Sequence, residues 1–470
     1  MIIRGISRRW REPGGYRQLL AIALPLILST GAWSVQHFVD RMFLSWYSPE
    51  AIAASMPAGI LCFALISLFM GTASYVSTFV AQYYGAGRFR RIGPSVWQGI
   101  YVSIFGGVVI LSIIPFAGPI FRFIGHLPEV RQLEKEYFQI LCLGGGFVVA
   151  SAAISGFFSG LGRSWPIMWV NCAATCLNLV LDYAIIFGNW GLPEMGIRGA
   201  GYATVIANIF SFALFMILIS GKEYRKRYNT FAGWRLEKGL FRRLLYFGFP
   251  SGVQFFLDIS GFTFFILIIG RLGMGSLAAS NIALNISTLA FMPMIGCGIA
   301  ISVLVGQYLG KGMPQLAQKS VYSGFHIVSV YMAGLAVLYL IVPAVFIRPF
   351  SVLADPDSFK EIYRLSVILL RFVAIYSLFD AMNIVFSSAI KGAGDTRFVM
   401  YTLALITFFL MVMPAYFAVV VLGYGLMTCW LFASAYIMCL GFLFFLRFRS
   451  GKWKGMRVIE SRLDLIRITD

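Results

Sequence analysis

Asn178 and Asp182 stand four residues apart within an apolar run that extends from about Ile167 to Phe187. An ionised carboxylate at the centre of such a run costs roughly 2.5 to 3.5 kcal/mol on insertion scales, so an aspartate there normally faces protein or water and serves a pathway. Residues four positions apart share one face of a helix, so both side chains offer oxygens to one point. The pattern predicts an ion site inside a membrane. A buried hydrogen-bonded pair that joins two helices is the alternative.

The composition indicates an all-α polytopic membrane protein. Of the 470 residues, 59% are hydrophobic and only 12% are charged, and the apolar runs are long enough to cross a hydrocarbon layer of about 30 Å. The first run lacks a small-residue cleavage site, so we expect it to be retained as a span. We expect twelve transmembrane helices, at about residues 17–45, 51–81, 95–119, 135–160, 166–188, 199–220, 245–270, 276–306, 320–347, 362–390, 398–421 and 425–447.

The lysines and arginines that produce the formal net charge of +19 lie mainly in short segments between these spans. They gather before span 1, after spans 2, 6 and 8, and after span 12, whereas the alternate segments are poorer in them or carry compensating acids. The positive-inside effect explains this distribution and predicts that both termini are cytoplasmic, in a bacterial inner membrane. Nucleic acid is therefore not an expected partner.

Three sequence features recur in the same order at nearly constant spacing. Residues 82–87 (Gln-Tyr-Tyr-Gly-Ala-Gly) recur at 307–312 (Gln-Tyr-Leu-Gly-Lys-Gly), an offset of 225, and Pro25 matches Pro250 at the same offset. Gly160-Leu161-Gly162 recurs as Gly392-Ala393-Gly394 at an offset of 232. We infer two homologous six-helix bundles, and because six is even, the repeats are parallel. A proline early in the first span of each bundle frees a backbone carbonyl and predicts a hinge at Pro25 and at Pro250.

The repeat and the charge distribution together predict the parts of the chain. The two bundles form two lobes, with a cavity between them near the midplane of the membrane. The parts are a basic cytoplasmic N-terminus at 1–16, an N-lobe of spans 1–6 at 17–220, a basic linker at 221–244, a C-lobe of spans 7–12 at 245–447 and a basic tail at 448–470.

Short polar and glycine-rich motifs mark several spans. They are Phe38-Val39-Asp40 in span 1, the two Gln-Tyr-x-Gly-x-Gly turns, Ser159-Gly160-Leu161-Gly162-Arg163-Ser164, Asn178-x-x-Leu181-Asp182, Gly199-Ala200-Gly201-Tyr202-Ala203-Thr204 and Lys391-Gly392-Ala393-Gly394-Asp395-Thr396. In combination they resemble the multidrug and toxic compound extrusion (MATE) family over essentially the whole chain, including its NorM-like branch.

The resemblance implies a V-shaped pair of lobes and an antiporter in which the entry of Na⁺ or H⁺ drives the export of cationic, amphipathic organic compounds. It implies a monomeric transporter that is not an enzyme and that needs no cofactor besides the coupling ion. The chain contains no Walker phosphate-binding loop, so ATP is not the expected energy source.

By position, the amino-terminal ion site of the family falls on Asp40, Asn178, Asp182 and Thr204. Two carboxylates, an amide oxygen and a hydroxyl form an oxygen set that suits Na⁺, and no other metal is expected. Two aspartates in a dry lobe do not both ionise cheaply, so without Na⁺ one of them is expected to hold a proton. Asp40 could instead be a counter-ion to Arg41, and Thr204 could bond back to its own helix.

The second half carries its acids at other positions. Asp182 has no carboxylate counterpart there, whereas Asp258 in span 7 and Asp380 in span 10 have none in the first half. In the NorM-like branch, acids at these two positions form a second cation site or a counter-charge for the substrate, although the span 7 acid there is typically glutamate. Gln254, one turn before Asp258, could complete a polar face. Asp395 is expected to cap the helix of span 11.

Aromatic residues make up 16% of the chain, and a lipophilic cation binds well against rings with a carboxylate nearby. The residues expected to line the cavity are Trp33, His37, Tyr75, Phe256 and Phe379, of which His37 could also relay protons. Two other functions are weighed. A lipid-linked oligosaccharide flippase, or another lipid or metabolite flippase, would usually need a cationic cavity, and an integral membrane transferase would need a catalytic cluster in a sizeable loop.

Overall fold

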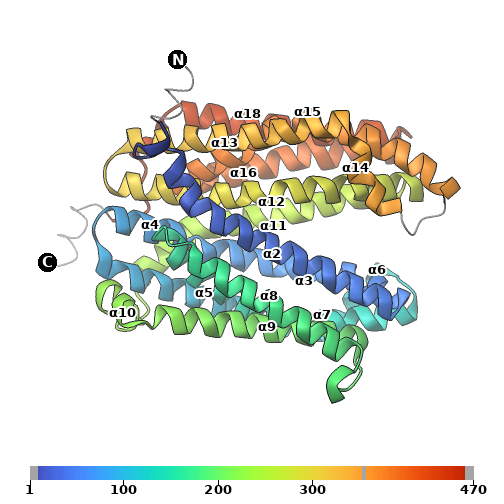
Figure 1. The fold of residues 1–470 in the computed structure, drawn as a ribbon, viewed down its shortest axis with the longest axis horizontal. Coiled ribbons are helices and arrows are strands. Elements are labelled where there is room, and N and C mark those ends of the chain that lie inside the picture. The colour runs from blue at the N-terminus through green and yellow to red at the C-terminus, as the bar shows by residue number, and fades with distance from the viewer. Residues whose placement is uncertain (1–8, 352–355, 461–470) are drawn as a thin grey trace. The chain divides into compact units, whose positions relative to one another are not determined.

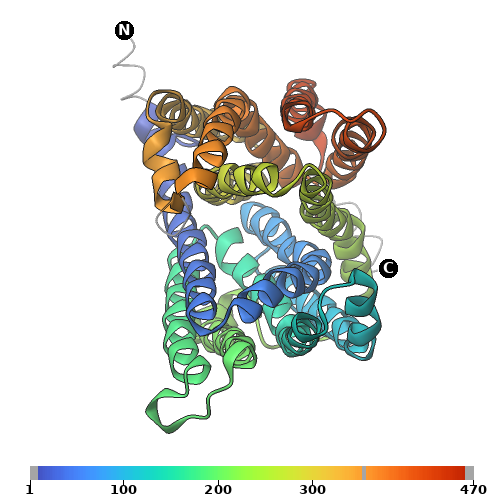
Figure 2. The ribbon, with the colours of Figure 1, turned by 90° about the vertical axis from the view of Figure 1, so that its right-hand side faces the viewer.

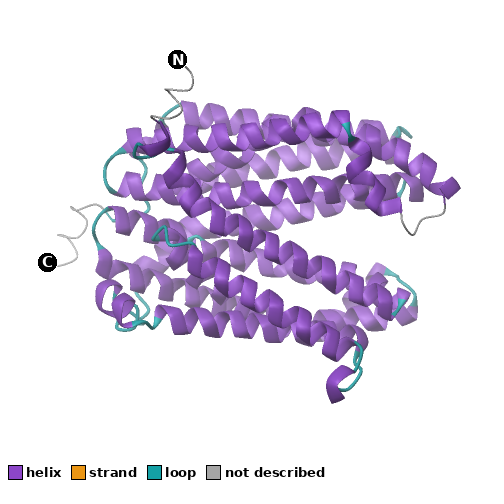
Figure 3. Ribbon diagram, viewed as in Figure 1, coloured by secondary structure: helices purple, strands orange, loops and turns teal. Residues whose placement is uncertain are grey.

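The computed structural model describes residues 9–351 and 356–460. The expected basic ends at 1–16 and 448–470 therefore lie partly outside the described residues. Within these ranges every regular element is a helix (Figure 3). The all-α fold class predicted from the composition is confirmed.

Twelve helices in the described residues are long and apolar enough to cross a membrane, as expected (Figure 1). Most ends lie within a few residues of the predicted ones. The first six spans are α2 (Tyr16–Tyr47), α3 with α4 (Pro49–Ser74 and Val76–Gly85), α5 with α6 (Ile92–Ile113 and Ala117–Ile124), α7 (Pro128–Gly160), α8 (Trp165–Ile186) and α9 (Gly196–Ile219). After the short helix α10 (Lys222–Tyr228), the last six are α11 (Lys238–Gly270), α12 (Met274–Gly310), α13 (Pro314–Ile341), α15 (Pro356–Ala393), α16 (Thr396–Ile406) with its extensions, and α18 (Leu426–Arg449).

The repeated Gln-Tyr-x-Gly-x-Gly motif has the same backbone conformation in both copies. Gly87 and Gly312 adopt φ values of +71° and +74°, a left-handed conformation that glycine reaches without steric cost. In each copy the N–H of the residue after this glycine donates to the carbonyl of the motif tyrosine, at 2.9 and 2.8 Å. This is the Schellman way of ending a helix, so the motif recurs because α4 and α12 end in the same way.

Span 11 departs from regular α-helix. After α16 the chain forms a π-helical segment, η5 (Thr407–Val412), then α17 (Met413–Tyr416) and a second π-helical segment, η6 (Phe417–Val421). Pro414 lies between the two π segments and has no N–H to donate to the preceding turn, which is a known cause of local rearrangement in the helical ladder.

The chain divides into two compact units. Unit 1 comprises the residues up to Ile27, Leu257–Leu309 and Met313–Met456, and unit 2 comprises Leu28–Phe256, Gly310–Gly312 and the residues from Arg457 on. Figure 2 looks along the helices and shows that the blue-to-green helices of unit 2 group as a bundle. The boundary between the two units falls inside α2 and again inside α11. The lobe boundaries predicted from the repeat stay a prediction.

Within unit 2, α3 and α11 approach closely because both carry glycine at the contact. A Cβ on Gly71 would lie 2.8 Å from the Cα of Gly252, and a Cβ on Gly252 would overlap the carbonyl oxygen of Leu68 and the hydroxyl of Thr72. Small residues at a helix crossing permit this approach and are a principal source of packing energy inside membranes.

Gly252→Ala is expected to destabilise the protein because the new methyl group has no room against backbone atoms that cannot move independently. Overpacking of this kind costs about 1–3 kcal/mol, so the thermal unfolding midpoint in detergent should fall by several degrees. Gly59→Ala is the matched control, since a Cβ at Gly59 on α3 meets nothing within 4 Å. Equal midpoints for the two variants would show that the α3–α11 approach is not tight.

Candidate functional site

Asp40, Asn178 and Asp182 meet inside unit 2. Asp40 on α2 is 7% exposed, and Asn178 and Asp182 on α8 are both 0% exposed. With its amide turned to donate, Asn178 places its nitrogen 3.0 Å from Asp40 Oδ1 and 3.2 Å from Asp182 Oδ2. In the reverse orientation an amide oxygen would face two acceptor oxygens, so the donating orientation satisfies both acids, while Gln36 Nε2 lies 3.2 Å from the same atom of Asn178.

The two carboxyl groups therefore lie close together, around one amide nitrogen. Two acids so placed in buried surroundings do not both ionise cheaply, so the arrangement suits a proton or another cation shared between them. It differs from the expectation in one respect, since Asn178 here presents its N–H group to the acids and not its oxygen.

Facing polar stripes on α2 and α8 position these groups. On α2 the stripe continues through Gln36, one turn before Asp40, and on α8 through Thr175, whose hydroxyl lies 3.5 Å from Gln36 Oε1. One further turn along, Asn171 Nδ2 donates to Ser29 Oγ at 2.6 Å. Spacings of three or four residues on α8, and of seven and four on α2, place these residues on one face of each helix, which is a signal that the sequence already contains. The buried Tyr137 also lies near both acids, but no spacing in the sequence indicates it.

Asp182 Oδ1 is buried and has no hydrogen-bond partner in the described residues. A buried carboxylate oxygen without a partner is costly, and a small cation would satisfy it. The oxygen atoms at this site therefore suit Na⁺ or a proton held by Asp40 and Asp182. Gln36 and Thr175 supply neighbouring oxygen atoms.

Thr204 is half-buried on α9, and no hydrogen bond in the described part of the chain joins it to the acids. The structure thus brings three of the four predicted ion-site residues together, whereas Thr204 lies on α9, a helix that packs against α8. Its part in the ion site stays a prediction.

The acids of the second half lie in unit 1. Asp380 on α15 is buried, accepts a hydrogen bond from Asn383 and lies near enough to the half-buried Asp258 on α11 for electrostatic repulsion. Lys391 on α15 lies near enough to Asp258 for electrostatic attraction. The sequence did not indicate this cation as part of the site, because Lys391 stands in a glycine-rich motif at the end of its span. Gln254 is buried one turn before Asp258 on α11.

The aromatic residues expected in the cavity have different surroundings. The rings of Trp33 and His37 lie 4.9 Å apart, and Phe63 continues the cluster at 5.5 Å from Trp33 and 5.9 Å from Phe255. Tyr75, where α3 gives way to α4, is buried. Phe256 and Phe379 are half-buried.

Asp395 stands at the N-cap position of α16, as expected, but its side chain makes no capping hydrogen bond to that helix. Its Oδ2 instead accepts from Arg447 of α18 at 2.8 and 2.7 Å, because an ionised carboxylate bonds a guanidinium more strongly than a backbone N–H.

Twelve apolar helices with ionisable groups enclosed by protein define a polytopic membrane protein of the kind that moves ions or solutes. The MatE family model matches residues 25–184 and 250–417. The chain therefore belongs to the MatE family, and the resemblance seen in its motifs is confirmed.

Curated relatives and solved structures agree with this assignment. The chain is 25% identical to a probable multidrug resistance protein NorM of Thermotoga maritima over 94% of each chain. It is 29% identical to that of Pseudomonas putida over 88% of this chain and 90% of the relative. An outward-facing multidrug resistance MATE family transporter has the same fold, with a TM-score of 0.85 at 19% identity over 96% of this chain and 99% of that chain.

Asn178→Ala is expected to destabilise the protein because both acids lose the N–H group that they share. A hydrogen bond to a charged group contributes about 1.5–3 kcal/mol, so the thermal unfolding midpoint in detergent should fall by several degrees. Asn285→Ala, at an exposed asparagine on α12, is the control, and equal midpoints for the two variants would contradict the prediction.

Proposed function

We propose that this protein is a secondary active exporter that exchanges Na⁺ or H⁺ for cationic, amphipathic organic compounds. The observation that carries the proposal is the buried pair of carboxyl groups of Asp40 and Asp182, which has one oxygen without a partner. Membership of the MatE family and the printed names of the relatives, which are multidrug resistance proteins, support export of drugs. Na⁺ or a proton at the pair is the coupling ion, and ATP has no role.

The hinge in α2 links ion binding to substrate release. Within α2, unit 1 ends at Ile27 and unit 2 begins at Leu28, two residues after Pro25. The part of α2 before the proline therefore belongs to unit 1, and the part that carries Asp40 belongs to unit 2. When a cation neutralises the acid pair, the attraction between α2 and α8 changes and α2 bends at Pro25. Pro250 has the corresponding place in α11, where unit 2 ends at Phe256 and unit 1 resumes at Leu257.

The energy of one coupling ion is sufficient for this exchange. One cation moving down a membrane potential of about 100 mV releases roughly 2.3 kcal/mol. That free energy sustains a substrate gradient on the order of 50-fold before any chemical gradient of the ion is added.

The second half supplies the counter-charge for the substrate. An organic cation is attracted by the two acids Asp258 and Asp380, together with Gln254 one turn before Asp258. The ammonium group of Lys391, which lies near Asp258, competes with the organic cation for that acid. The aromatic cluster of Trp33 and His37 offers ring faces to a lipophilic cation. Tyr75, Phe256 and Phe379 are further candidates for the cavity wall.

The charge distribution supports an orientation with both termini in the cytoplasm, in a bacterial inner membrane. The monomeric state is proposed from the family resemblance and not from the charges. Arginines and lysines follow spans that end on the side of the termini, including the exposed Arg225, Lys226 and Arg227 of α10. The twelve spans are even in number, so both chain ends share that side.

Efflux of a cationic dye from reconstituted liposomes tests the function, with the Na⁺ gradient and the pH gradient imposed separately. Wild-type protein is expected to move the dye with at least one of the two gradients. Asp40→Asn is expected to reduce that gradient-driven efflux by tenfold or more, because the acid pair loses the charge that holds the ion. Movement of no cationic dye under either gradient would favour a lipid or metabolite substrate instead.

Glu129→Gln is the matched control for this experiment, since it makes the same carboxyl-to-amide change at an exposed position of unit 2. Both variants are compared at equal amounts of protein inserted in the liposomes. Efflux by Asp40→Asn at the rate of the control would refute the role of the acid pair.

A further inference from the structure

The segment that joins α10 to α11, residues 229–237, lies along the beginning of α5 within unit 2. Three side chains of α5 donate hydrogen bonds to carbonyls of segment 229–237, namely Trp97 to Thr230 at 2.6 Å, Gln98 to Arg235 at 3.4 Å and Tyr101 to Trp234. A Cβ on Gly93 would overlap the carbonyl oxygen of Asn229, so the glycine permits the close approach of the two backbones. The segment therefore has a fixed place on α5.

The face of α5 that holds this segment continues into a row of exposed apolar side chains. Trp97 and Tyr101 share that face with Ile104, Val108 and Leu111, because successive members of the row are four or three residues apart. The last three are exposed, and large apolar side chains exposed on a membrane-spanning helix face the lipid. Segment 229–237 therefore lies where a lipid-facing row of α5 reaches the surface of the membrane.

Segment 229–237 turns its own apolar side chains outward. Its carbonyls are held by α5, whereas the side chains of Phe231, Trp234 and Leu236 are exposed, Trp234 to 58% and Leu236 to 52%. Aromatic residues gather at membrane–water interfaces, where one end of the side chain is in apolar and the other in polar surroundings. The exposed side of the segment is thus suited to the boundary between lipid headgroups and acyl chains.

Positive charge surrounds these apolar side chains. Seven exposed lysines and arginines stand between positions 222 and 242, namely Lys222, Arg225, Lys226, Arg227, Arg235, Lys238 and Arg242. The guanidinium of Arg225 lies 5.6 Å from the ring centroid of Phe231. Charge and apolar surface are therefore adjacent in space as well as in sequence.

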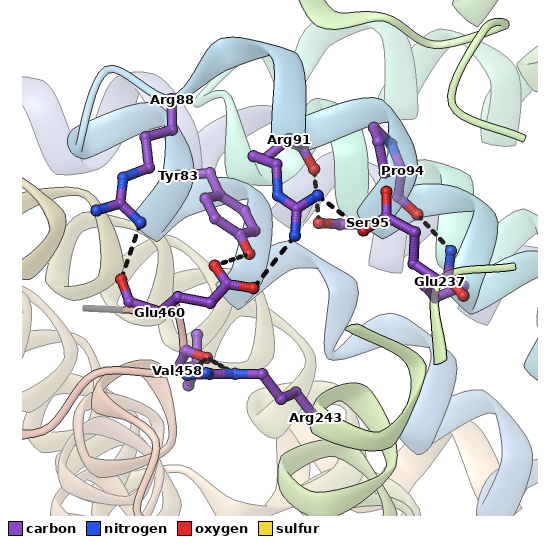
Figure 4. A network of polar contacts seen from close by, with 10 residues as sticks. Tyr83, Arg88, Arg91, Pro94, Ser95, Glu237, Arg243, Val458 and Glu460 are labelled. Atoms are coloured by element: carbon purple, nitrogen blue, oxygen red, sulfur yellow. Dashed lines mark hydrogen bonds and ion pairs between the residues drawn. The ribbon is translucent and has the colours of Figure 1, made fainter. Parts of the chain in front are cut away.

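The acids of the same stretch do not neutralise this charge. Arg91 pairs with Glu237 at 2.7 Å (Figure 4), and Arg163 pairs with Glu223 at 3.2 Å. In the described part of the chain, no ion pair joins any of the seven exposed cations to an acid. The surplus of positive charge is therefore available to an external anion.

We propose that α10 and segment 229–237 form a binding surface for anionic phospholipids of the adjacent leaflet. The phosphate groups of the lipids meet the seven cations, and Phe231, Trp234 and Leu236 enter the boundary with the acyl chains. A basic cluster next to a membrane span attracts anionic lipids, and exposed apolar side chains beside it strengthen the binding. The lipid-facing row of α5 favours a lipid over a soluble anion or a protein. This role goes beyond the proposed exchange and holds whichever ion or substrate the protein moves.

Photo-crosslinking from position 236 tests the surface. Leu236 is replaced by the photoreactive p-benzoylphenylalanine, and the full-length protein is illuminated in liposomes of equal phosphatidylglycerol and phosphatidylcholine. The adducts are identified by mass spectrometry and are expected to contain mainly phosphatidylglycerol. One basic residue near the surface changes the affinity for an anionic lipid by about fivefold. Arg235→Gln is therefore expected to lower the ratio of phosphatidylglycerol to phosphatidylcholine adducts by about fivefold.

Arg131→Gln is the matched control, since it makes the same change at the beginning of α7, where Glu129 and Glu134 offset the charge. It is expected to leave the ratio unchanged. Equal adducts of the two lipids in the otherwise wild-type protein, or equal ratios for the two variants, would overturn the lipid surface. A ratio that falls in phosphate but not in chloride of the same ionic strength would assign the cations to free phosphate, and adducts with a protein in native membranes would assign the surface to a protein partner.

Dye efflux measured on the same liposomes separates this proposal from the proposed function. Gradient-driven efflux together with equal adducts rejects the lipid surface alone. Adducts with mainly phosphatidylglycerol but no efflux under either gradient reject the exchange and support the lipid surface.

Discussion

The constraint on which the first half of this protein depends is the burial of two carboxyl groups inside a helix bundle. Two ionised acids at hydrogen-bonding distance in such surroundings repel strongly, and one neutral acid beside one ionised acid relieves most of that cost. Asn178 donates to both acids and stabilises the remaining charge. The proposed coupling ion, a cation or a proton, would relieve the charge that remains on the pair.

The same constraint accounts for the helices that surround the pair. Polar residues inside a membrane must find partners in neighbouring helices, so α2 and α8 present their polar stripes to each other, through Gln36 with Thr175 and through Ser29 with Asn171. Glycines elsewhere in unit 2 permit the close packing that keeps water out, as where Gly71 meets Gly252. Stability and the ion site thus have a common origin in the pairing of helix faces.

Much of this architecture could be predicted from the sequence because its signals are local. Apolar length indicated the twelve spans, and the spacing of Asn178 and Asp182 indicated their shared face. The repeated glycine motif marked two helix ends, at Gly87 and Gly312, that have the same left-handed conformation. What escaped prediction depends on tertiary contacts, including the donating orientation of Asn178, the approach of Lys391 to Asp258 and the π-helical segments around Pro414. The partner of Asp395 was missed for the same reason, because Arg447 lies 52 positions away in the sequence.

The repeated turns and the ion site act on the same elements from different ends. The helix α2 begins in unit 1, where Gln18 is held by Tyr308, and ends in unit 2, where Asp40 meets α8. In the proposed exchange, a change of charge at Asp40 acts on a helix whose beginning is held by Tyr308. The segment between Gln18 and Asp40 contains Pro25, which has already removed one hydrogen bond, so this segment is where α2 bends most easily.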